Sequence, residues 1–461
     1  INPVQFRYTL AAGEAFFAPQ VIMSYSSEGF TGLTHQYHDL IREHICRGAY
    51  KHAKRPVLIN NWEATYFDFD KEKIVKIAQQ AHELGIEMLV LDDGWFGKRD
   101  SDNSGLGDWY TNEKKMDGTM GELGDEIHAL GMKFGLWFEP EMINEDSDLY
   151  RAHPDWALCP SGRAPSLGRH QLILDMTRRD VQDYVVEAVS AVLRSADIAY
   201  VKWDMNRNMA EVGSPSLPAD RQGEVFHRYI LGVYSVMERI TSAFPNVLFE
   251  SCSGGGGRFD AGLLYYMPQN WTSDDSDAIE RLTIQHGCSL VYPPSAMTSH
   301  VSAVPNHQVG RVTPLKTRGA VAMLGSFGYE LDMSRMTPED CVRVRTQIIE
   351  YKCSRQLVAQ GDRVADHGFE FGVHRRLAVA GEGDDVGRGA VGHHAPQRRC
   401  ELCADVFAGV EAPRAGMLGI PAAFAVDAVE RAEFRLGGQE VDPQRESQPP
   451  RMYRAEDDVM E

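Results

Sequence analysis

The chain contains 461 residues, 43% of them hydrophobic, and its formal net charge is -19 at pH 7. This length and apolar content predict a folded protein with a large core and roughly two or three domains. The acidic balance excludes nucleic acid as an expected partner, since phosphate binding needs clustered Lys and Arg, and no run of about 18 apolar residues is present to span a membrane.

The first 50 residues read as the end of one domain followed by a connecting helix. Residues 4–8 alternate apolar and polar side chains, which is typical of a strand. A helical pattern then runs from about His35 to Cys46. We therefore expect residues 1–50 to form the tail of an N-terminal β-domain plus a linker helix.

Residues 51–360 alternate short β-branched runs with longer helical patterns, an order that predicts βα units and a parallel sheet. Apolar residues recur at helical spacing over residues 74–84 and 181–192. Eight strands with helices between them favour an α/β fold of the (β/α)8 TIM-barrel type over a doubly wound sheet, which more often has fewer strands. The candidate strands are Val57–Trp62, Met88–Asp92, Lys133–Phe138, Leu172–Asp175, Ala199–Asp204, Val247–Glu250, Met267–Thr272 and Ser289–Tyr292.

Residues 361–461 have a different texture. Arg, Ala, Gly and Val dominate, and the alternation of the preceding region fades. Runs such as residues 386–392 have no face that could join a core. We expect poorly specified structure in this region.

Carboxylates and aromatic residues concentrate where the candidate strands end, and active sites of such barrels are built at that face. Aromatic rings stack on the apolar faces of sugars, and a pair of carboxyl groups supplies the acid, base or nucleophile of glycoside cleavage. The composition therefore indicates glycoside chemistry rather than phosphate or nucleotide chemistry. The segments are Trp62-Glu63, Asp92-Asp93-Gly94-Trp95, Trp137-Phe138-Glu139, Lys202-Trp203-Asp204 and Trp271-Thr272-Ser273-Asp274-Asp275.

Each of these side chains also has a purely structural interpretation. Asp204 could form a strand-end ion pair with Lys202 or Arg207. Asp274 could be the N-cap of the helix that follows it. Taken by themselves, these residue types and spacings leave both interpretations open.

The same holds for the acids and tryptophans at the other strand ends. Asp92 and Asp93 could cap a turn, or they could bind neighbouring sugar hydroxyls through charge-assisted hydrogen bonds. Trp62 and Trp137 could belong to the core or form the wall of a sugar site.

Several long segments resemble glycoside hydrolase family 36, the bacterial-type α-galactosidases. They occur in the expected order, and the resemblance covers roughly residues 1–360. The segments are Leu91-Asp92-Asp93-Gly94-Trp95-Phe96, Lys202-Trp203-Asp204-Met205-Asn206-Arg207, Ser251-Cys252-Ser253-Gly254-Gly255-Gly256-Gly257-Arg258-Phe259-Asp260 and Trp271-Thr272-Ser273-Asp274-Asp275.

The resemblance implies hydrolysis of terminal α-linked galactose, as in melibiose- or raffinose-type sugars, through a covalent galactosyl-enzyme intermediate with retention of configuration. It implies that Asp204 is the nucleophile and Asp274 the general acid/base, with Asp275 and Asp277 as bystanders or helix caps. It places Cys252 and Gly255 near the galactose 2-hydroxyl. The residues implied to bind galactose are Trp62, Asp92, Asp93, Trp137, Arg169, Lys202, Cys252, Gly255 and Trp271.

No cofactor and no metal are expected. The run Gly254–Gly257 invites a phosphate-loop interpretation, but no Gly-Lys-Ser/Thr follows it, which favours close backbone approach to a ligand. The 16 His residues show no metal-ligand spacing, and Cys252 has no Cys or His partner at metal-site distance in the sequence. The eight cysteines lack a regular framework, which predicts free thiols and a cytoplasmic location.

The chain departs from the family at both ends. Family members carry a large N-terminal β-sandwich and a C-terminal β-domain and are often tetramers, so the resemblance implies a barrel with remnants of flanking β-domains and a homo-oligomer. A frame-shifted reading of a GC-rich gene is a hypothesis for the Arg/Ala/Gly-rich composition after Gly361. Sequencing the DNA near the codon for Asp362 tests it.

Three alternative functions remain open. A galactosyltransferase of the same superfamily would pass galactose to a sugar acceptor, which product analysis at high acceptor concentration detects. An α-N-acetylgalactosaminidase would need space around the 2-substituent near Cys252 and Gly255. A non-catalytic galactose-binding fragment would not turn over a chromogenic α-galactoside.

Overall fold

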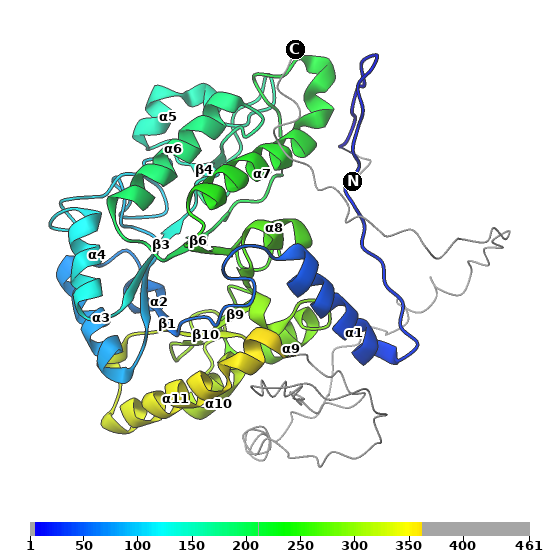
Figure 1. The fold of residues 1–461 in the computed structure, drawn as a ribbon. Helices are drawn as coiled ribbons and strands as arrows, with labels where there is room; N and C mark the ends of the chain where they lie inside the picture. The colour runs from blue at the N-terminus through cyan, green and yellow to red at the C-terminus, as the bar shows by residue number, and fades with distance from the viewer. Residues whose placement is uncertain (1–4, 211, 362–461) are drawn as a thin grey trace. The chain divides into compact units, whose positions relative to one another are not determined.

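The computed structural model describes residues 5–210 and 212–361, which contain a closed barrel of eight parallel strands (Figure 1). The strand order around the barrel is β1-β10-β9-β8-β7-β6-β3-β2, and β1 pairs with both β10 and β2 to close it. The predicted (β/α)8 barrel is therefore confirmed. The barrel strands are β1 (Leu58–Asn60), β2 (Met88–Leu91), β3 (Lys133–Phe138), β6 (Tyr200–Trp203), β7 (Leu248–Ser251), β8 (Gln269–Trp271), β9 (Met297–Ser302) and β10 (Ser326–Glu330).

Helices surround the strands of the barrel (Figure 1). The two helical patterns predicted over residues 74–84 and 181–192 lie in α3 and α6, and their repeating apolar residues are largely buried. The long helices are α3 (Lys71–Leu84), α4 (Met120–Ala129), α6 (Arg179–Ser195), α7 (Val225–Ala243), α9 (Ala278–Cys288), α10 (Leu315–Ala322) and α11 (Pro338–Gln360). Shorter helices are α2 (Trp62–Thr65), α5 (Asp148–Ala152) and α8 (Ala261–Tyr266).

Local sequence explains where these helices begin and end. The Asp70 side chain accepts a hydrogen bond from the backbone of Lys73 and so caps the first turn of α3. Gly85 ends that helix with φ 94°, a conformation that glycine adopts without steric penalty. At α4, Thr119 and Glu122 form a reciprocal capping box.

Two of the eight segments predicted as barrel strands do not belong to the barrel. Residues 172–175 contain β5 (Leu172–Ile173), which pairs antiparallel with β4 (Met142–Ile143) in a separate two-stranded sheet. Residues 289–292 form a turn after α9. The barrel instead uses β9 and β10, whose sequences, Met-Thr-Ser-His-Val-Ser and Ser-Phe-Gly-Tyr-Glu, carry polar residues into buried positions and therefore lack an apolar run.

The segment before the barrel contains a helix that starts earlier than predicted. Helix α1 (Gly29–Leu40) continues into a short π-helix, Ile41–Ile45. Residues 5–28 contain no strand and no helix. The backbone N–H of Arg7 donates a hydrogen bond to the carbonyl oxygen of Gly223 at 3.1 Å. The tail of a β-domain expected in residues 1–50 stays a prediction. The poorly specified structure expected for residues 361–461 lies outside the described residues, apart from Gly361.

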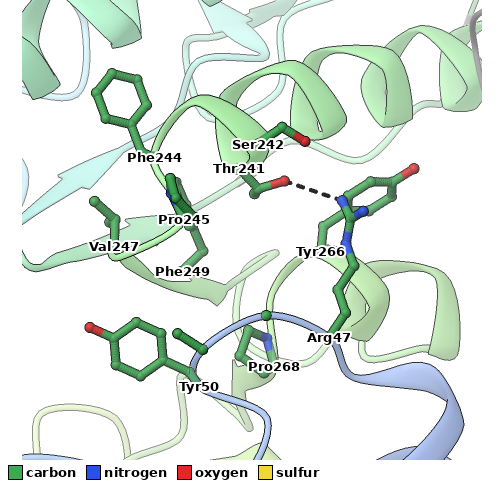
Figure 2. Close-up of a pocket in the computed structure, with 12 residues that line it drawn as sticks. Arg47, Tyr50, Thr241, Ser242, Phe244, Pro245, Val247, Phe249, Tyr266 and Pro268 are labelled. Atoms are coloured by element: carbon green, nitrogen blue, oxygen red, sulfur yellow. Dashed lines mark hydrogen bonds between the residues drawn. The ribbon is translucent and has the colours of Figure 1, made fainter.

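A cavity of about 170 Å³ lies where β7 and β8 begin (Figure 2). Aromatic rings form much of its wall, and the guanidinium group of Arg47 donates to the hydroxyl of Thr241 at 3.3 Å and pairs with Glu238 at 2.6 Å. The lining residues are Arg47, Gly48, Ala49, Tyr50, Thr241, Ser242, Phe244, Pro245, Val247, Phe249, Tyr266 and Pro268.

Close packing of α7 generates a prediction about stability. A Cβ atom on Gly232 would lie 1.8 Å from the carbonyl oxygen of Met176, so Gly232→Ala must push α7 away and should lower the free energy of unfolding by about 1–3 kcal/mol or more. Gly287 in α9 has no atom within 4 Å of such a Cβ, and Gly287→Ala should raise that free energy by up to about 1 kcal/mol. Urea denaturation of both variants measures this. Equal effects would contradict the packing argument.

Candidate active site

The carboxyl ends of the barrel strands bring together most of the predicted site residues, at the opposite end of the strands from the cavity of Figure 2. Asp92 directly follows β2, Asp204 follows β6 and Cys252 follows β7. All three are buried, although Asp92 and Asp204 carry acidic side chains. Parallel pairing sets this arrangement, because Trp203 lies opposite both Phe138 of β3 and Ser251 of β7, so the strands end at one level.

Asp204 lies deep in this site and accepts hydrogen bonds on both oxygens. Its Oδ2 accepts from the Trp137 indole at 3.2 Å and from the Asn206 side-chain amide at 2.8 Å. Its Oδ1 accepts from the backbone N–H of Met205 at 2.8 Å and of Gly254 at 3.4 Å. Two donors therefore face each oxygen of the Asp204 carboxyl group, and the group is held in one orientation.

Asp274 lies at the mouth of the site and is exposed to solvent, unlike Asp204. Its Oδ1 accepts from the indole of Trp271 at 3.0 Å. Surrounding protein atoms desolvate the carboxyl group and so raise its pKa, and the negative charge of Asp204 raises it further. The residue is exposed as a whole, but its carboxyl group is poorly solvated. The cap of α9 is Asp277, whose side chain accepts from Ile279 and Glu280, and Asp274 is therefore not the N-cap.

Lys202 and Asp92 form a buried ion pair at the bottom of the site. The Lys202 ammonium lies 3.1 Å from Asp92 Oδ2, which also accepts from the Asn60 side-chain amide at 2.5 Å. Burial alone would lower the pKa of Lys202, but the charges of Asp92 and other nearby carboxylates raise it well above its ordinary value. Lys202 is therefore a cation that lies 5.6 Å from the centre of the Trp271 ring.

Asp93 has a different environment from its neighbour Asp92. Both of its oxygens accept from Arg99, with a shortest distance of 2.8 Å, and both side chains are buried. Burial raises the pKa of the Asp93 carboxyl against the opposing effect of Arg99. Arg99 thus donates to both oxygens of the Asp93 carboxyl group, and direct sugar binding by Asp93 stays a prediction.

The remaining predicted binding residues lie at different depths. Arg169 is exposed, with φ 53°, and its guanidinium lies 3.7 Å from Asp102. Trp62 is half-buried and packs edge-on against Tyr66 and Phe67. Trp137 is buried. The structure therefore places Trp62 and Arg169 nearer to solvent than Trp137.

Cys252 lies near both aspartates, and Gly255 lies against the backbone of Asp274. The Cys252 thiol is fully buried, and burial followed by the charges of Asp204 and Asp274 raises its pKa well above the ordinary value. Gly255 has φ 81°, and a Cβ on it would lie 2.6 Å from the backbone nitrogen of Asp274. Only glycine fits this turn without displacing Asp274.

Sequence reasoning missed several polar residues of this site. Glu139 was part of the Trp-Phe-Glu run at the end of β3, but no role was assigned to it, although it is fully buried beside Asp204. Glu330 and His300 form a buried pair, with 3.0 Å between Glu330 Oε2 and His300 Nδ1. They escaped notice because the strands that carry them, β10 and β9, were not recognised. The acidic residue at the end of a barrel strand was the available signal for both glutamates.

No group of three or more His, Cys, Asp or Glu side chains within residues 5–210 and 212–361 is arranged to hold a metal ion. No helix in the same part of the chain is long and apolar enough to cross a membrane.

Comparisons with known proteins point to one family. The sequence profile of the Melibiase family matches residues 15–361. Alpha-galactosidase AgaA of Geobacillus stearothermophilus is 56% identical over 386 residues, covering 84% of this chain and 51% of AgaA. Alpha-galactosidase Mel36A of Lactobacillus acidophilus is 51% identical over 361 residues, covering 78% of this chain and 49% of Mel36A. The chain spans about half the length of these curated relatives.

Solved structures agree with the sequence comparison. The crystal structure of AgaA, titled a GH36 alpha-galactosidase, aligns with a TM-score of 0.78 and 58% identity over 79% of this chain and 51% of AgaA. Variants of AgaA have been crystallised with raffinose and with stachyose, and both structures align with the same TM-score of 0.78.

The buried pair of Asp93 and Arg99 generates a prediction about stability. Arg99→Met leaves Asp93 buried without its cation and should lower the free energy of unfolding by about 3–5 kcal/mol. The deficit should shrink as the pH falls, because the unpaired carboxyl has a raised pKa and the native state is then stabilised by protonation. Arg151 contacts two exposed aspartates, so Arg151→Met is the control and should change stability by less than about 1 kcal/mol. Urea denaturation across a pH series measures both, and a pH-independent deficit would contradict the argument.

Proposed function

The chain belongs to the Melibiase family, and we propose that its barrel hydrolyses terminal α-linked galactose from raffinose-type oligosaccharides with retention of configuration. The observation that carries the proposal is the contrast between two carboxyl groups in one site. Asp204 is buried and accepts from four donors, whereas Asp274 is exposed, accepts from one indole and has a raised pKa. A retaining glycosidase needs this pair, one group ionised and the other protonated.

Asp204 is the nucleophile in this mechanism. Its hydrogen bonds from Trp137, Asn206 and the Met205 backbone hold the carboxylate in one orientation. Attack of one carboxylate oxygen on the anomeric carbon forms the β-galactosyl ester while the leaving group departs. The donors that held the anion remain to hold the ester carbonyl.

Asp274 is the general acid and then the general base. Its raised pKa keeps the proton on the carboxyl group as substrate binds, and the group donates that proton to the departing glycosidic oxygen. Its position at the mouth gives it access to water, which it deprotonates in the second step. The acid function is lost as the pH rises through this raised pKa, so the elevation extends activity toward neutral pH.

Galactose recognition is assigned to the groups around the aspartates. The Asp92–Lys202 pair supplies a charged acceptor and a charged donor next to each other for hydroxyl groups. Trp62, Trp137 and Trp271 supply aromatic surface for the sugar ring, with Arg169 at the exposed rim. Cys252 lies near both aspartates and Gly255 near Asp274, and the two residues are assigned to the side of the 2-hydroxyl.

The relatives support these roles. The AgaA variant crystallised with raffinose carries an Asp-to-Asn substitution, and the variant crystallised with stachyose carries an Asp-to-Ala substitution. The two substituted aspartates are the same number of positions apart in AgaA as Asp204 and Asp274 are in this chain. Removing a catalytic carboxyl group allows an unreacted substrate to remain bound, which supports the assignment of the pair.

Turnover of nitrophenyl α-galactoside by the purified chain is the test of the proposed function. Asp204→Ala should abolish turnover, because no ester can form. Activity on the α-glucoside should be far lower, because a hydroxyl inverted at C4 cannot make the hydrogen bonds that the buried Asp92–Lys202 pair offers to the galactose hydroxyl. No turnover by a folded wild-type chain would favour a binding fragment, and galactosyl products that form only with sugar acceptors would favour a transferase.

Azide distinguishes the roles of the two aspartates. Asp274→Ala should still form the ester from the nitrophenyl substrate, whose leaving group needs no proton, and should then show a burst followed by slow deglycosylation. Azide needs no general base, so it should attack that ester and yield α-galactosyl azide. In Asp204→Ala azide should attack the substrate directly and yield the β-anomer. Nuclear magnetic resonance of the products measures the anomer, and exchanged anomers would mean that the roles are reversed.

The turn beside Asp274 allows a matched test of geometry. Gly255→Ala places a Cβ 2.6 Å from the Asp274 backbone nitrogen, so it should displace the acid/base and reduce kcat/KM by about 10²-fold. Gly254 has a similar left-handed conformation, φ 50°, but a Cβ there meets only Asn206 at 4.0 Å. Gly254→Ala therefore bears the same kind of backbone cost without the displacement. Steady-state kinetics compare the two, and equal losses would contradict the contact argument.

A further inference from the structure

Glu139 is a buried carboxyl group next to the proposed nucleophile. It directly follows β3, and Asp204 directly follows the neighbouring strand β6. The register pairs Phe138 with Trp203, so the next residue of each strand, Glu139 and Asp204, emerges from the barrel beside the other. Glu139 has no exposed surface, and the mechanism above does not use it.

The carboxyl group of Glu139 connects two loops of the site. Its Oε1 accepts from the backbone N–H of Asn206, whose side chain donates to Asp204. Its Oε2 lies 3.2 Å from the side-chain amide of Gln171, two residues after Arg169. One side chain thus touches both the loop that orients the nucleophile and the loop that carries the rim arginine.

The charge surroundings of Glu139 contrast with those of a second glutamate two residues later. Glu141 is equally buried, but Arg258 contacts both of its oxygens, at 2.8 and 3.0 Å. Glu139 has no salt bridge to any residue in the described ranges, 5–210 and 212–361. The charged groups that face it are the Asp204 and Asp93 carboxylates and Arg99, and Arg99 is bonded to Asp93.

The contact with Gln171 accommodates a neutral acid. The nitrogen and oxygen of a side-chain amide exchange places when the group turns by 180°, and their assignment rests on the surrounding hydrogen bonds. Gln171 Oε1 is buried without a partner in the present orientation. After the turn this oxygen accepts from the O–H of a protonated Glu139, while Glu139 Oε1 still accepts from Asn206.

We propose that Glu139 is a positioning residue that holds the loops of Asp204 and Arg169 together, and that it does so as a neutral acid. This inference rests on the proposed function for its effect on catalysis. The physical reason is that a second anion beside Asp204, buried and without a cation, would be strongly disfavoured. Burial, followed by the charge of Asp204, raises the pKa of Glu139 to about 8, so the group keeps its proton at neutral pH and loses it as the pH rises through that value.

Kinetics of two Glu139 variants test the positioning role. Glu139→Gln presents an oxygen to Asn206 and an N–H to Gln171, as the neutral acid does, and should keep kcat and KM within about threefold of the wild type. Glu139→Ala frees both loops and should lower kcat/KM by about 10²-fold, with a lower kcat from the Asp204 side and a higher KM from the Arg169 side. A folded Glu139→Gln as impaired as Glu139→Ala would overturn the proposal, because Glu139 would then act as an anion.

Infrared spectroscopy tests the charge state without turnover. The wild type at neutral pH should show a carboxylic-acid C=O band that Glu139→Gln lacks and that disappears as the pH rises through about 8. Glu141→Gln is the matched control and should keep the band, while losing thermal stability because Arg258 is left unpaired. Absence of the band overturns the neutral acid even in an active enzyme. A band in an inactive wild type would instead reject the proposed function and leave the charge state of Glu139 standing.

Discussion

The barrel confines several carboxyl groups at the buried carboxyl ends of its strands, and this crowding of like charges is the constraint on which the site depends. A buried charge without a partner is strongly unfavourable, so each group must be paired, hydrogen-bonded or neutral. Three pairs of the site satisfy the first condition: Asp92 with Lys202, Asp93 with Arg99 and Glu141 with Arg258. Glu330 satisfies the second through its hydrogen bond with His300. Asp204 satisfies the second through neutral donors. Asp274 and Glu139 have raised pKa values, which favours the neutral form, the third of these conditions.

Barrel topology makes this pairing possible between residues that are distant in sequence. Lys202 and Asp92 are 110 positions apart, yet their side chains meet because every barrel strand is parallel and ends at the same face. Close approach of the strands depends on small residues inside the barrel. A Cβ on Gly135 of β3 would lie 2.9 Å from the Tyr200 side chain of β6, the strand that leads to Asp204. Backbone pairing of the strands therefore sets the relative positions of the charged residues.

The sequence predicted the parts of the fold and site that follow from local periodicity. It did not predict the strands and side-chain partners that depend on contacts between distant segments. The barrel was predicted because apolar strands alternate with amphipathic helices, and the strand-end acids follow from it. Residues 297–302 and 326–330 were missed since strands with polar residues facing a barrel interior have no apolar run. The partnership of Asp93 with Arg99 depends on side-chain directions that no spacing encodes. Asp277, by contrast, was expected from the family resemblance as a bystander or helix cap, and it is the cap of α9.

The distribution of cations links the two roles proposed for the aspartates. Lys202, Arg99 and Arg258 are each bonded to another carboxylate, and Asp204 forms no salt bridge within residues 5–210 and 212–361. An uncompensated charge on Asp204 has two consequences at once. It leaves the proposed nucleophile held by neutral donors rather than neutralised by a bidentate cation, and it adds to the effect of burial in raising the pKa of Asp274, the proposed acid. In the proposed mechanism the charge of Asp204 disappears when the ester forms, so the pKa of Asp274 should fall, and a lower pKa is what the same group needs to act as the base in the second step.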